Sequence, residues 1–355
     1  MTPRRRILIA CLCTFVLLLF ALLIAFNHAK PRLLVLHTFS EDGHWEQLFD
    51  RGVQRALAGN RQPLAVRWHY MSFSSAEVQS NAEWQAASAR ARAVITSWKP
   101  DVVLIVGEEA QQWLGYRYVS DDPRAQRLVY ATAEDPQRFG YPGAANVTGV
   151  RELLPLAQIR DLLAVLEARP LRIQALGMAD PTGEVERDQV QAFDWQDHRL
   201  APVRLVETYA QWQQAVREAE GQADVLLVLS FAGMPRSARE PGVVDSLEVA
   251  RWTEANARPL PISVRERFVQ GGGALAIAPS AEGLGEQAGR LALQALRDAT
   301  LPAPQDSEDF AVGVGLQPLA RRGYRLPGIY VQAARAAQLL FRDISEPAST
   351  PAPAR

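Results

Sequence analysis

Few side chains in this sequence are of a type and spacing that could perform covalent chemistry. The sequence has no glycine-rich phosphate loop, no Gly-x-Ser-x-Gly motif and no His-Glu-x-x-His motif. None of its five histidines pairs with another at metal-ligand spacing. His37 and His44 lie near the end of a predicted strand, but a lone histidine there is more often hydrogen-bonded or solvated than catalytic. We therefore predict no catalytic residue, no metal site, no cofactor and no enzymatic activity.

Polar and aromatic residues that directly follow predicted strands form the better candidate site. In open α/β sheets, ligands bind beyond the carboxyl ends of the strands. Hydroxyl and backbone N–H groups suit a ligand carboxylate, Asp and Glu suit an ammonium, and Phe could cover a ring. The predicted ligand-binding residues are Thr38, Phe39, Ser40, Gly107, Glu108, Thr132, Glu134, Asp135, Asp180, Ser230, Phe231 and Ser280.

A structural explanation for the same residues stands beside this one. Ser, Thr, Asp and Glu are also favoured at helix starts, where they cap free N–H groups and suit the helix dipole. Glu108 and Glu109 fit the role of first-turn acids better than that of ligand contacts, and Ser280 could be a helix cap alone. The convergence of several strand ends therefore carries more weight than any single residue.

Alternating strands and helices predict doubly wound parallel sheets. About ten strands are too many for one comfortable sheet, which favours two lobes. Predicted strands are Leu33–His37, Leu64–Tyr70, Asp101–Val106, Leu128–Ala131, Leu171–Gly177, Val203–Glu207, Asp224–Leu229, Leu260–Ser263 and Gly273–Ala278, with Phe310–Val314 crossing back. Predicted helices are His44–Leu57, Asn81–Trp98, Glu108–Leu114, Pro155–Glu167, Glu184–Phe193, Tyr209–Glu220, Val243–Asn256, Glu282–Ala299 and Gln332–Arg342.

The segment Leu128–Val150 is predicted to join the lobes. It starts as an apolar strand, passes through turn-forming residues and ends at a glycine-flanked crossing. We expect Asn146, Thr148 and Gly149 to form the hinge, with a ligand held between the lobes.

Charge and cysteine content limit the possible partners and compartment. Without the first 30 residues, 34 basic side chains face 39 acidic ones, a net charge of −5, which argues against nucleic-acid binding. The only cysteines are Cys11 and Cys13, so the folded part has no thiol and no disulfide. This composition is compatible with an oxidising compartment.

The N-terminus carries a targeting signal. Arg4, Arg5 and Arg6 precede an uninterrupted apolar run from Ile7 to Phe26, long enough to span a bilayer as a helix. We expect a single-pass inner-membrane anchor over residues 7–26 with the folded part in the periplasm, by the positive-inside tendency. A cleaved signal followed by release to the periplasm is the alternative.

Three segments resemble a known family. Asp135-Pro136 followed by Gly143–Val150 (GAANVTGV) resembles the "DP…pGgNvTGv" signature of ABC-transporter substrate-binding proteins whose better-known members bind aromatic amino acids. Trp98–Val103 (WKPDVV) resembles that family's "kPDvi" segment. Gly273–Ala278, followed by Leu284-Gly285 and Gln287-Ala288, resembles its "Galaal…lG.qAa" ending. The resemblance covers most of residues 32–303 and implies a type I periplasmic-binding-protein fold: two Rossmann-like lobes, three crossings, and hinge closure on a small ligand.

Combining the pattern with the resemblance, we predict the following organisation. Residues 1–30 form a cytoplasmic tip and membrane anchor or signal; 31–148 and about 280–303 form the first lobe; 149–279 and about 304–328 form the second; 329–345 form a C-terminal helix; and 346–355 form a disordered tail.

The resulting hypothesis is an extracytoplasmic solute-binding protein that presents a small molecule, an amino acid or similar, to an ABC permease. Two segments, Thr38–Trp45 and Arg322–Pro327, resemble instead solute-binding proteins encoded with membrane sensors. A ligand-sensing subunit working with a sensor kinase or similar receptor is therefore an alternative. A small-molecule enzyme on a doubly wound fold and a lobe pair kept only as an interaction module are further alternatives.

Overall fold

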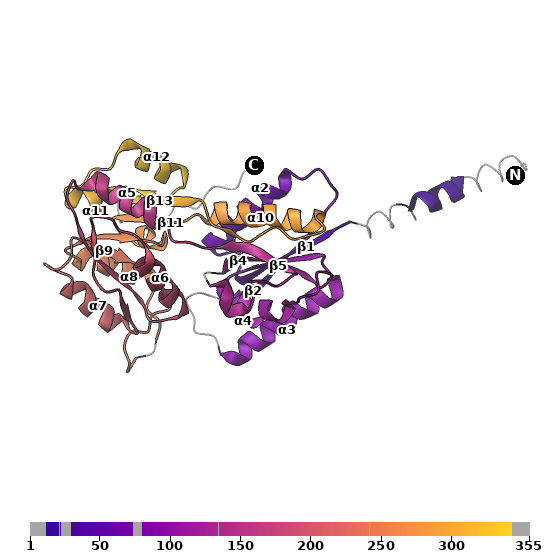
Figure 1. Cartoon of the computed structure of the whole chain (residues 1–355), viewed down its shortest axis with the longest axis horizontal. Coiled ribbons are helices and arrows are strands. Elements are labelled where there is room, and N and C mark those ends of the chain that lie inside the picture. Colours follow the sequence, from indigo (N-terminus) through magenta and orange to yellow (C-terminus); the bar gives the residue numbers. More distant parts are fainter. Residues whose placement is uncertain are drawn as a thin grey trace, which may run out of the picture.

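Two open sheets, each with helices on both faces, divide the chain into two lobes (Figure 1). The computed structural model describes residues 12–20, 22, 30–73, 80–133, 135–240 and 242–342. The predicted pair of doubly wound lobes is confirmed. The predicted tail over 346–355 lies outside the described residues.

The first lobe is built on a six-stranded sheet of order β12-β5-β4-β3-β1-β2, in which all neighbouring strands are parallel. Its strands are β1 (Arg32–Phe39), β2 (Ala65–Phe73), β3 (Val102–Val106), β4 (Arg127–Ala133), β5 (Val147–Arg151) and β12 (Gln305–Asp306). Its helices are α2 (His44–Ala58), α3 (Asn81–Trp98), α4 (Glu108–Trp113) and α10 (Ala281–Arg297), with short 3-10 turns η1 (Gly115–Tyr118) and η2 (Pro136–Phe139).

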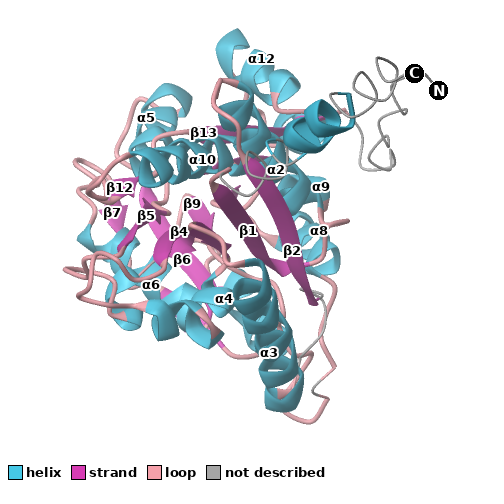
Figure 2. Ribbon diagram, turned by 90° about the vertical axis from the view of Figure 1, so that its right-hand side faces the viewer, coloured by secondary structure: helices cyan, strands magenta, loops and turns pink. Residues whose placement is uncertain are grey.

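Helices cover both faces of this sheet, as its continuous apolar strands require. Phe49 of α2 and Leu284 of α10 pack on one face, and Ala91 and Ile95 of α3 pack on the other. Figure 2 shows α3 and α4 on the side opposite α2 and α10. Helix α3 starts at a capping box, in which Ser80 and Glu83 satisfy each other's backbone N–H groups.

The second lobe is built on a sheet of order β14-β13-β11-β10-β9-β6-β7, with β8 also pairing with β6. Among the described strands of this sheet, only the β11–β13 pair is antiparallel. Its strands are β6 (Arg172–Met178), β7 (Arg199–Leu200), β8 (Arg204–Val206), β9 (Val225–Val228), β10 (Leu260–Ser263), β11 (Leu275–Pro279), β13 (Phe310–Gly315) and β14 (Leu340–Phe341). Its helices are α5 (Leu156–Leu166), α6 (Pro181–Ala192), α7 (Tyr209–Glu218), α8 (Ser246–Asn256), α9 (Arg267–Gln270), α11 (Leu316–Arg321) and α12 (Gly328–Ala336).

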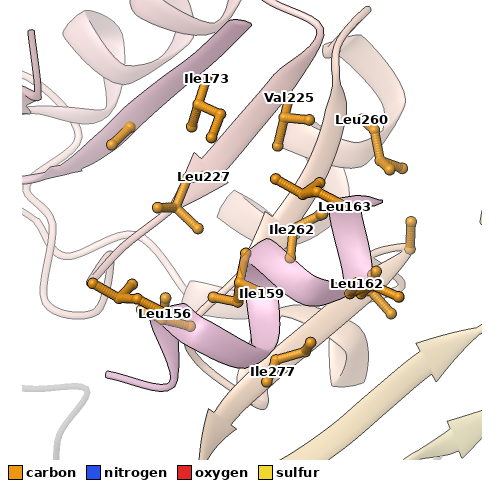
Figure 3. Close-up of a cluster of buried hydrophobic side chains, with 14 of the residues drawn as sticks. Leu156, Ile159, Leu162, Leu163, Ile173, Val225, Leu227, Leu260, Ile262 and Ile277 are labelled. Carbon is orange, nitrogen blue, oxygen red and sulfur yellow. The ribbon is translucent and has the colours of Figure 1, made fainter. Parts of the chain in front are cut away.

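Apolar packing also holds the second lobe together on both faces of its sheet. Leu156, Ile159, Leu162 and Leu163 of α5 lie against aliphatic residues of β6, β9, β10 and β11 (Figure 3). Trp212 of α7, fully buried, packs with α8 and α9 on the other face.

The boundary between the lobes differs from the prediction. Val147–Arg151 is a strand of the first sheet, so the chain leaves that sheet after Arg151 rather than at Gly149. The short strand β12 pairs with β5, so residues 305–306 also belong to the first lobe. Helix α12 and strand β14 pack on the second lobe, so the C-terminal helix is part of that lobe.

Half of the predicted membrane anchor over residues 7–26 falls outside the described residues. Residues 12–20, which are described, are helical. Among the helices of the described part of the chain, none combines the length and the apolar character needed to cross a membrane.

Candidate functional site

The carboxyl ends of strands from both sheets approach each other where the lobes meet. Glu109 lies in the first turn of α4, directly after β3, and Asp180 caps α6, directly after β6. Burial raises the pKa of Glu109, and the charge of Asp180 raises it further. The first turn of α4 in one lobe therefore lies close to the start of α6 in the other.

A buried ion-pair network connects the second lobe to Glu152, which directly follows β5 in the segment where the chain first crosses between the lobes. Arg265, two residues after β10, places Nη1 3.0 Å from Oε1 of Glu152 and donates from Nη2 to Oε1 of Glu186. The backbone N–H of Ser230 donates to the other Glu186 oxygen at 2.6 Å. Glu152 is 6% exposed and Glu186 is fully buried. Two desolvated carboxylates therefore depend on one guanidinium.

The three crossing segments are hydrogen-bonded to one another and to the lobes. After β5, the backbone N–H of Leu153 donates to the hydroxyl of Ser307 at 2.9 Å, and that of Leu154 donates to Gln189 of α6 at 2.9 Å. The second crossing lies between β11 and α10, and the third between β12 and β13. The backbone N–H of Ser280 in the second donates to the carbonyl of Asp309 in the third at 3.1 Å. A hinge motion between the lobes would have to preserve or break these hydrogen bonds.

Acidic side chains gather at the edge where the two lobes meet, which we call the meeting edge. Glu266, which starts α9, has its pKa raised to about 7, first by burial and then by the charge of Glu152. Burial also raises the pKa of Asp180, and the charge of Glu186 adds to the rise. Within the described ranges, Glu109, Asp180 and Glu266 form no ion pair with a cationic side chain. A desolvated carboxylate without an ion-pair partner is unfavourable. A bound cation would therefore stabilise the charged form of these three groups.

Three of the predicted site residues, Thr38, Gly107 and Thr132, make hydrogen bonds within the first lobe, and Gly107 and Thr132 bond to each other. The Thr38 hydroxyl donates to the carbonyl of Val106 at 3.1 Å and accepts from the N–H of Ala110 at 3.2 Å. The N–H of Gly107 donates to the hydroxyl of Thr132 at 2.8 Å. Gly107 has φ +102°, and a Cβ there would lie 2.2 Å from the Thr38 hydroxyl, so only glycine fits. These hydrogen bonds connect the carboxyl ends of β1, β3 and β4 to one another.

The other predicted first-lobe residues have local partners as well. Phe39 is half-buried against the core between the sheet and α3, and the carbonyl of Ser40 accepts from Gly43. Glu108 lies 3.4 Å from Arg138. Asp135 caps η2, and Glu134 lies outside the described residues.

Of the predicted residues of the second lobe, Asp180 and Ser280 cap helices, Ser230 has a buried hydroxyl and Phe231 lies in the core. Asp180 accepts from the N–H of Gly183 at 2.7 Å, and Ser280 caps α10 in the same way at 3.1 Å. The Ser230 hydroxyl is buried and has no hydrogen-bond partner in the described part of the chain. Phe231 is 2% exposed and packs in the core between the sheet and α7, so its predicted role as a cover for a ligand is not supported by its position.

The predicted hinge residues lie inside the first lobe. Asn146 is fully buried at the start of β5, where its amide accepts from the N–H of Ser120 and donates to two carbonyl groups. Thr148 and Gly149 are strand residues. A Cβ on Gly149 would lie 2.4 Å from the ring of Tyr130, which explains the glycine by packing instead of by hinge bending.

One histidine has an acidic partner. His37 Nε2 lies 2.8 Å from Oδ1 of Asp50, and the Tyr70 hydroxyl donates to the other oxygen of Asp50 at 2.7 Å. His37 is fully buried and stacked beside Trp68 and Tyr70. The closest arrangement to a general base is thus closed off from solvent.

Sequence reasoning missed the residues of the ion-pair network. Arg265 of this network, and the acid Glu266 beside it, follow Leu260–Ser263 within three residues, so the strand-end rule could have found them. Glu152 would have required recognising Val147–Arg151 as a strand of the first sheet. Glu186 lies inside a helix, where the sequence gives no comparable signal.

Solved structures with the same architecture were found, although no protein-family model matches the sequence and no curated protein is similar to it. An ABC domain from Streptococcus pneumonia, crystallised with L-Trp, has a TM-score of 0.59 and 16% identity, covering 86% of this chain and 99% of that one. A substrate-binding protein with adhesive properties from Clostridium difficile, in a ligand-free open form, has a TM-score of 0.62 and 14% identity, covering 84% and 96%. A leucine-binding protein from Thermotoga maritima has a TM-score of 0.51 and 10% identity, covering 77% and 84%.

The chain has the two-lobed fold of ABC-transporter substrate-binding proteins. The fold implied by the sequence resemblance is therefore confirmed. The similarity covers nearly the full length of the first two of these structures. At this level of identity, the comparison establishes architecture and leaves the ligand to be inferred from the residues themselves.

Proposed function

We propose that this chain is an extracytoplasmic solute-binding protein that holds a small molecule between its two lobes. The observation that carries the proposal is the approach of opposed strand ends, with Glu109 from one lobe and Asp180 from the other near enough to interact electrostatically. Contact with both lobes is what lets a ligand stabilise a closed arrangement by its differential affinity for that state.

The charges at the meeting edge support a ligand that carries a protonated amine, such as an amino acid or a related compound. Glu109, Asp180 and Glu266 form no ion pair within the described residues, although the charge of Arg265, which binds Glu152 and Glu186, also acts on Asp180. An ammonium would compensate the desolvated carboxylates. A carboxylate on the same ligand would need backbone N–H groups or hydroxyls, since Arg265 already binds two carboxylates and Arg138 lies beside Glu108.

A thermal-shift screen of amino acids, amines, nucleosides, sugars and small acids tests this function. A true ligand at a hundred times its Kd should add about 2.7 kcal/mol to the free energy of unfolding. Amines and amino acids are expected among the hits. Failure of every class would refute solute binding, and turnover of a hit would show an enzyme instead.

The proposal also includes a membrane anchor and an ABC permease as the partner. The apolar run from Ile7 to Phe26 supports an anchor that holds the two lobes at the outer face of the inner membrane, where the closed form meets an ABC permease. Mass spectrometry of the protein purified from membranes tests the anchor: retention of Met1–Lys30 is expected, and a mature chain that lacks them would refute it.

A sensing role is the second candidate function. Of the two segments that suggested it, Arg322–Pro327 now has a structural explanation. Arg322, in the segment that resembles sensor-associated proteins, donates to the Glu254 side chain and to carbonyl groups at the end of α8. This contact fixes α11 on the second lobe. Co-purification of the detergent-solubilised protein would decide between a permease and a receptor partner.

A further inference from the structure

A separate cavity of about 250 Å³ lies on the flank of the first lobe. Gln85, Ser88 and Arg92 of α3 line one wall, Trp113 ends α4, and Arg117 belongs to η1. Helices α3 and α4 lie together on one side of the first sheet (Figure 2). None of the lining residues belongs to the strand ends or to the crossing segments, so the cavity is distinct from the site proposed between the lobes.

Two arginines face this cavity without an anionic partner. In the described part of the chain, neither Arg92 nor Arg117 forms an ion pair with a carboxylate; Arg117 stacks over the ring of Tyr116 at 5.0 Å. Both charges act on Tyr118, where they oppose the rise in pKa that burial causes. Two guanidinium groups thus share one neighbourhood with no neutralising charge, an arrangement that an anion would stabilise.

An aromatic wall stands beside the arginines. The indole rings of Trp113 and Trp84 are parallel within 5°, with centroids 6.2 Å apart, and the ring of Phe73 also contacts Trp84. The buried hydroxyl of Ser88 donates to the carbonyl of Trp113 at 3.3 Å and ties α3 to the end of α4. The wall is therefore held in place before any ligand arrives, which lowers the entropy cost of binding.

The volume limits the occupant to a small molecule. One water occupies about 30 Å³ of liquid, so the cavity has room for roughly eight waters, or a ligand of about ten heavy atoms. We propose that this cavity binds a small planar carboxylate, with the carboxylate group between Arg92 and Arg117 and the ring against Trp113. Guanidinium groups bind carboxylates through paired hydrogen bonds, and an indole face suits a flat ring.

Titration of the full-length protein with benzoate, benzamide and benzylamine, followed by calorimetry, tests the proposal. Benzoate should bind, and the neutral and cationic analogues should bind at least about tenfold more weakly, because a hydrogen bond to a charged group contributes about 1.5–3 kcal/mol. Arg92→Gln and Arg117→Gln should each weaken benzoate binding by a similar factor. Arg90→Gln, an exposed arginine on the same helix but outside the cavity, is the matched control and should leave binding unchanged.

Fluorescence and salt give independent readouts. Benzoate should change tryptophan emission in the wild type, and Trp113→Phe should reduce that change while calorimetric binding persists. Raising the salt concentration should weaken binding through screening. Benzoate binding of equal strength in the wild type and in the two arginine variants would overturn the proposal. So would equal binding of benzylamine, or no binding at about 10 mM benzoate, where a 1 mM site would be nearly filled. Because Arg92, Trp113 and Arg117 are not among the residues proposed to bind a solute between the lobes, these outcomes can be told apart from amine binding there.

Discussion

Replacing Arg265 by methionine should strongly destabilise the second lobe at neutral pH. The guanidinium binds two carboxylates, of which Glu152 is 6% exposed and Glu186 is fully buried. Removing one partner from a buried ion pair costs about 3–5 kcal/mol, because the remaining charge stays desolvated. The loss should shrink on acidification, since protonation removes the uncompensated charge, and burial already raises the pKa of Glu152 in the wild type.

Urea denaturation at pH 7.5 and pH 5, followed by tryptophan fluorescence, measures this loss. Arg258→Met is the matched control: Arg258 pairs with Glu220 at 3.4 Å, but the two side chains are 78% and 62% exposed, so about 0–1 kcal/mol is expected. Adding Glu186→Gln to Arg265→Met should restore part of the stability at pH 7.5. Equal effects of the Arg265 and Arg258 substitutions at pH 7.5 would refute the reasoning.

The remaining predictions concern one acid and one glycine. Glu266 has a folded pKa of about 7 against an ordinary 4.5, so its contribution is fully present below pH 4.5 and is lost as pH rises through 7. Glu266→Gln should therefore stabilise the protein by about 2–3 kcal/mol at pH 8 and change little at pH 4.5, as urea denaturation at both pH values would show; a pH-independent effect would contradict this. Gly149→Ala should destabilise by about 1–3 kcal/mol, because its Cβ would lie 2.3 Å from the Tyr130 carbonyl oxygen. Gly328→Ala, with open space around it, is the control, and equal denaturation midpoints for the two variants would disprove the packing argument.

The sequence predicted the elements well because their patterns are local. Apolar runs such as Val102–Val106 and helical spacing such as that of Asn81–Trp98 identify elements without knowledge of their neighbours. Sheet membership is not local. The segment VTGVR has the turn-like residues of a crossing, yet it is strand β5 and pairs with β4. Its glycine is explained by packing, because Tyr130 of β4 occupies the space that a side chain at Gly149 would need.

The candidate site was harder to predict than the fold. The strand-end rule predicted the same edge of each sheet for every candidate residue, but it could not tell which hydroxyls were already bonded within the protein. Thr38 and Thr132 are committed to backbone groups, whereas the network of Glu152, Glu186 and Arg265 depends on contacts across more than 30 residues of sequence. Whether a polar group is free for a ligand is a property of the packed structure.

The most direct test of two lobes closing on a ligand is the distance between them. Spin labels at Gln112→Cys in α4 and Gln211→Cys in α7, both exposed, with Cys11 and Cys13 replaced by serine, would report that distance by pulsed electron resonance. With the solute that the thermal-shift screen identifies, the distance distribution should shift and narrow, and Asp180→Asn should weaken the response. Identical distributions with and without a saturating solute would contradict the account.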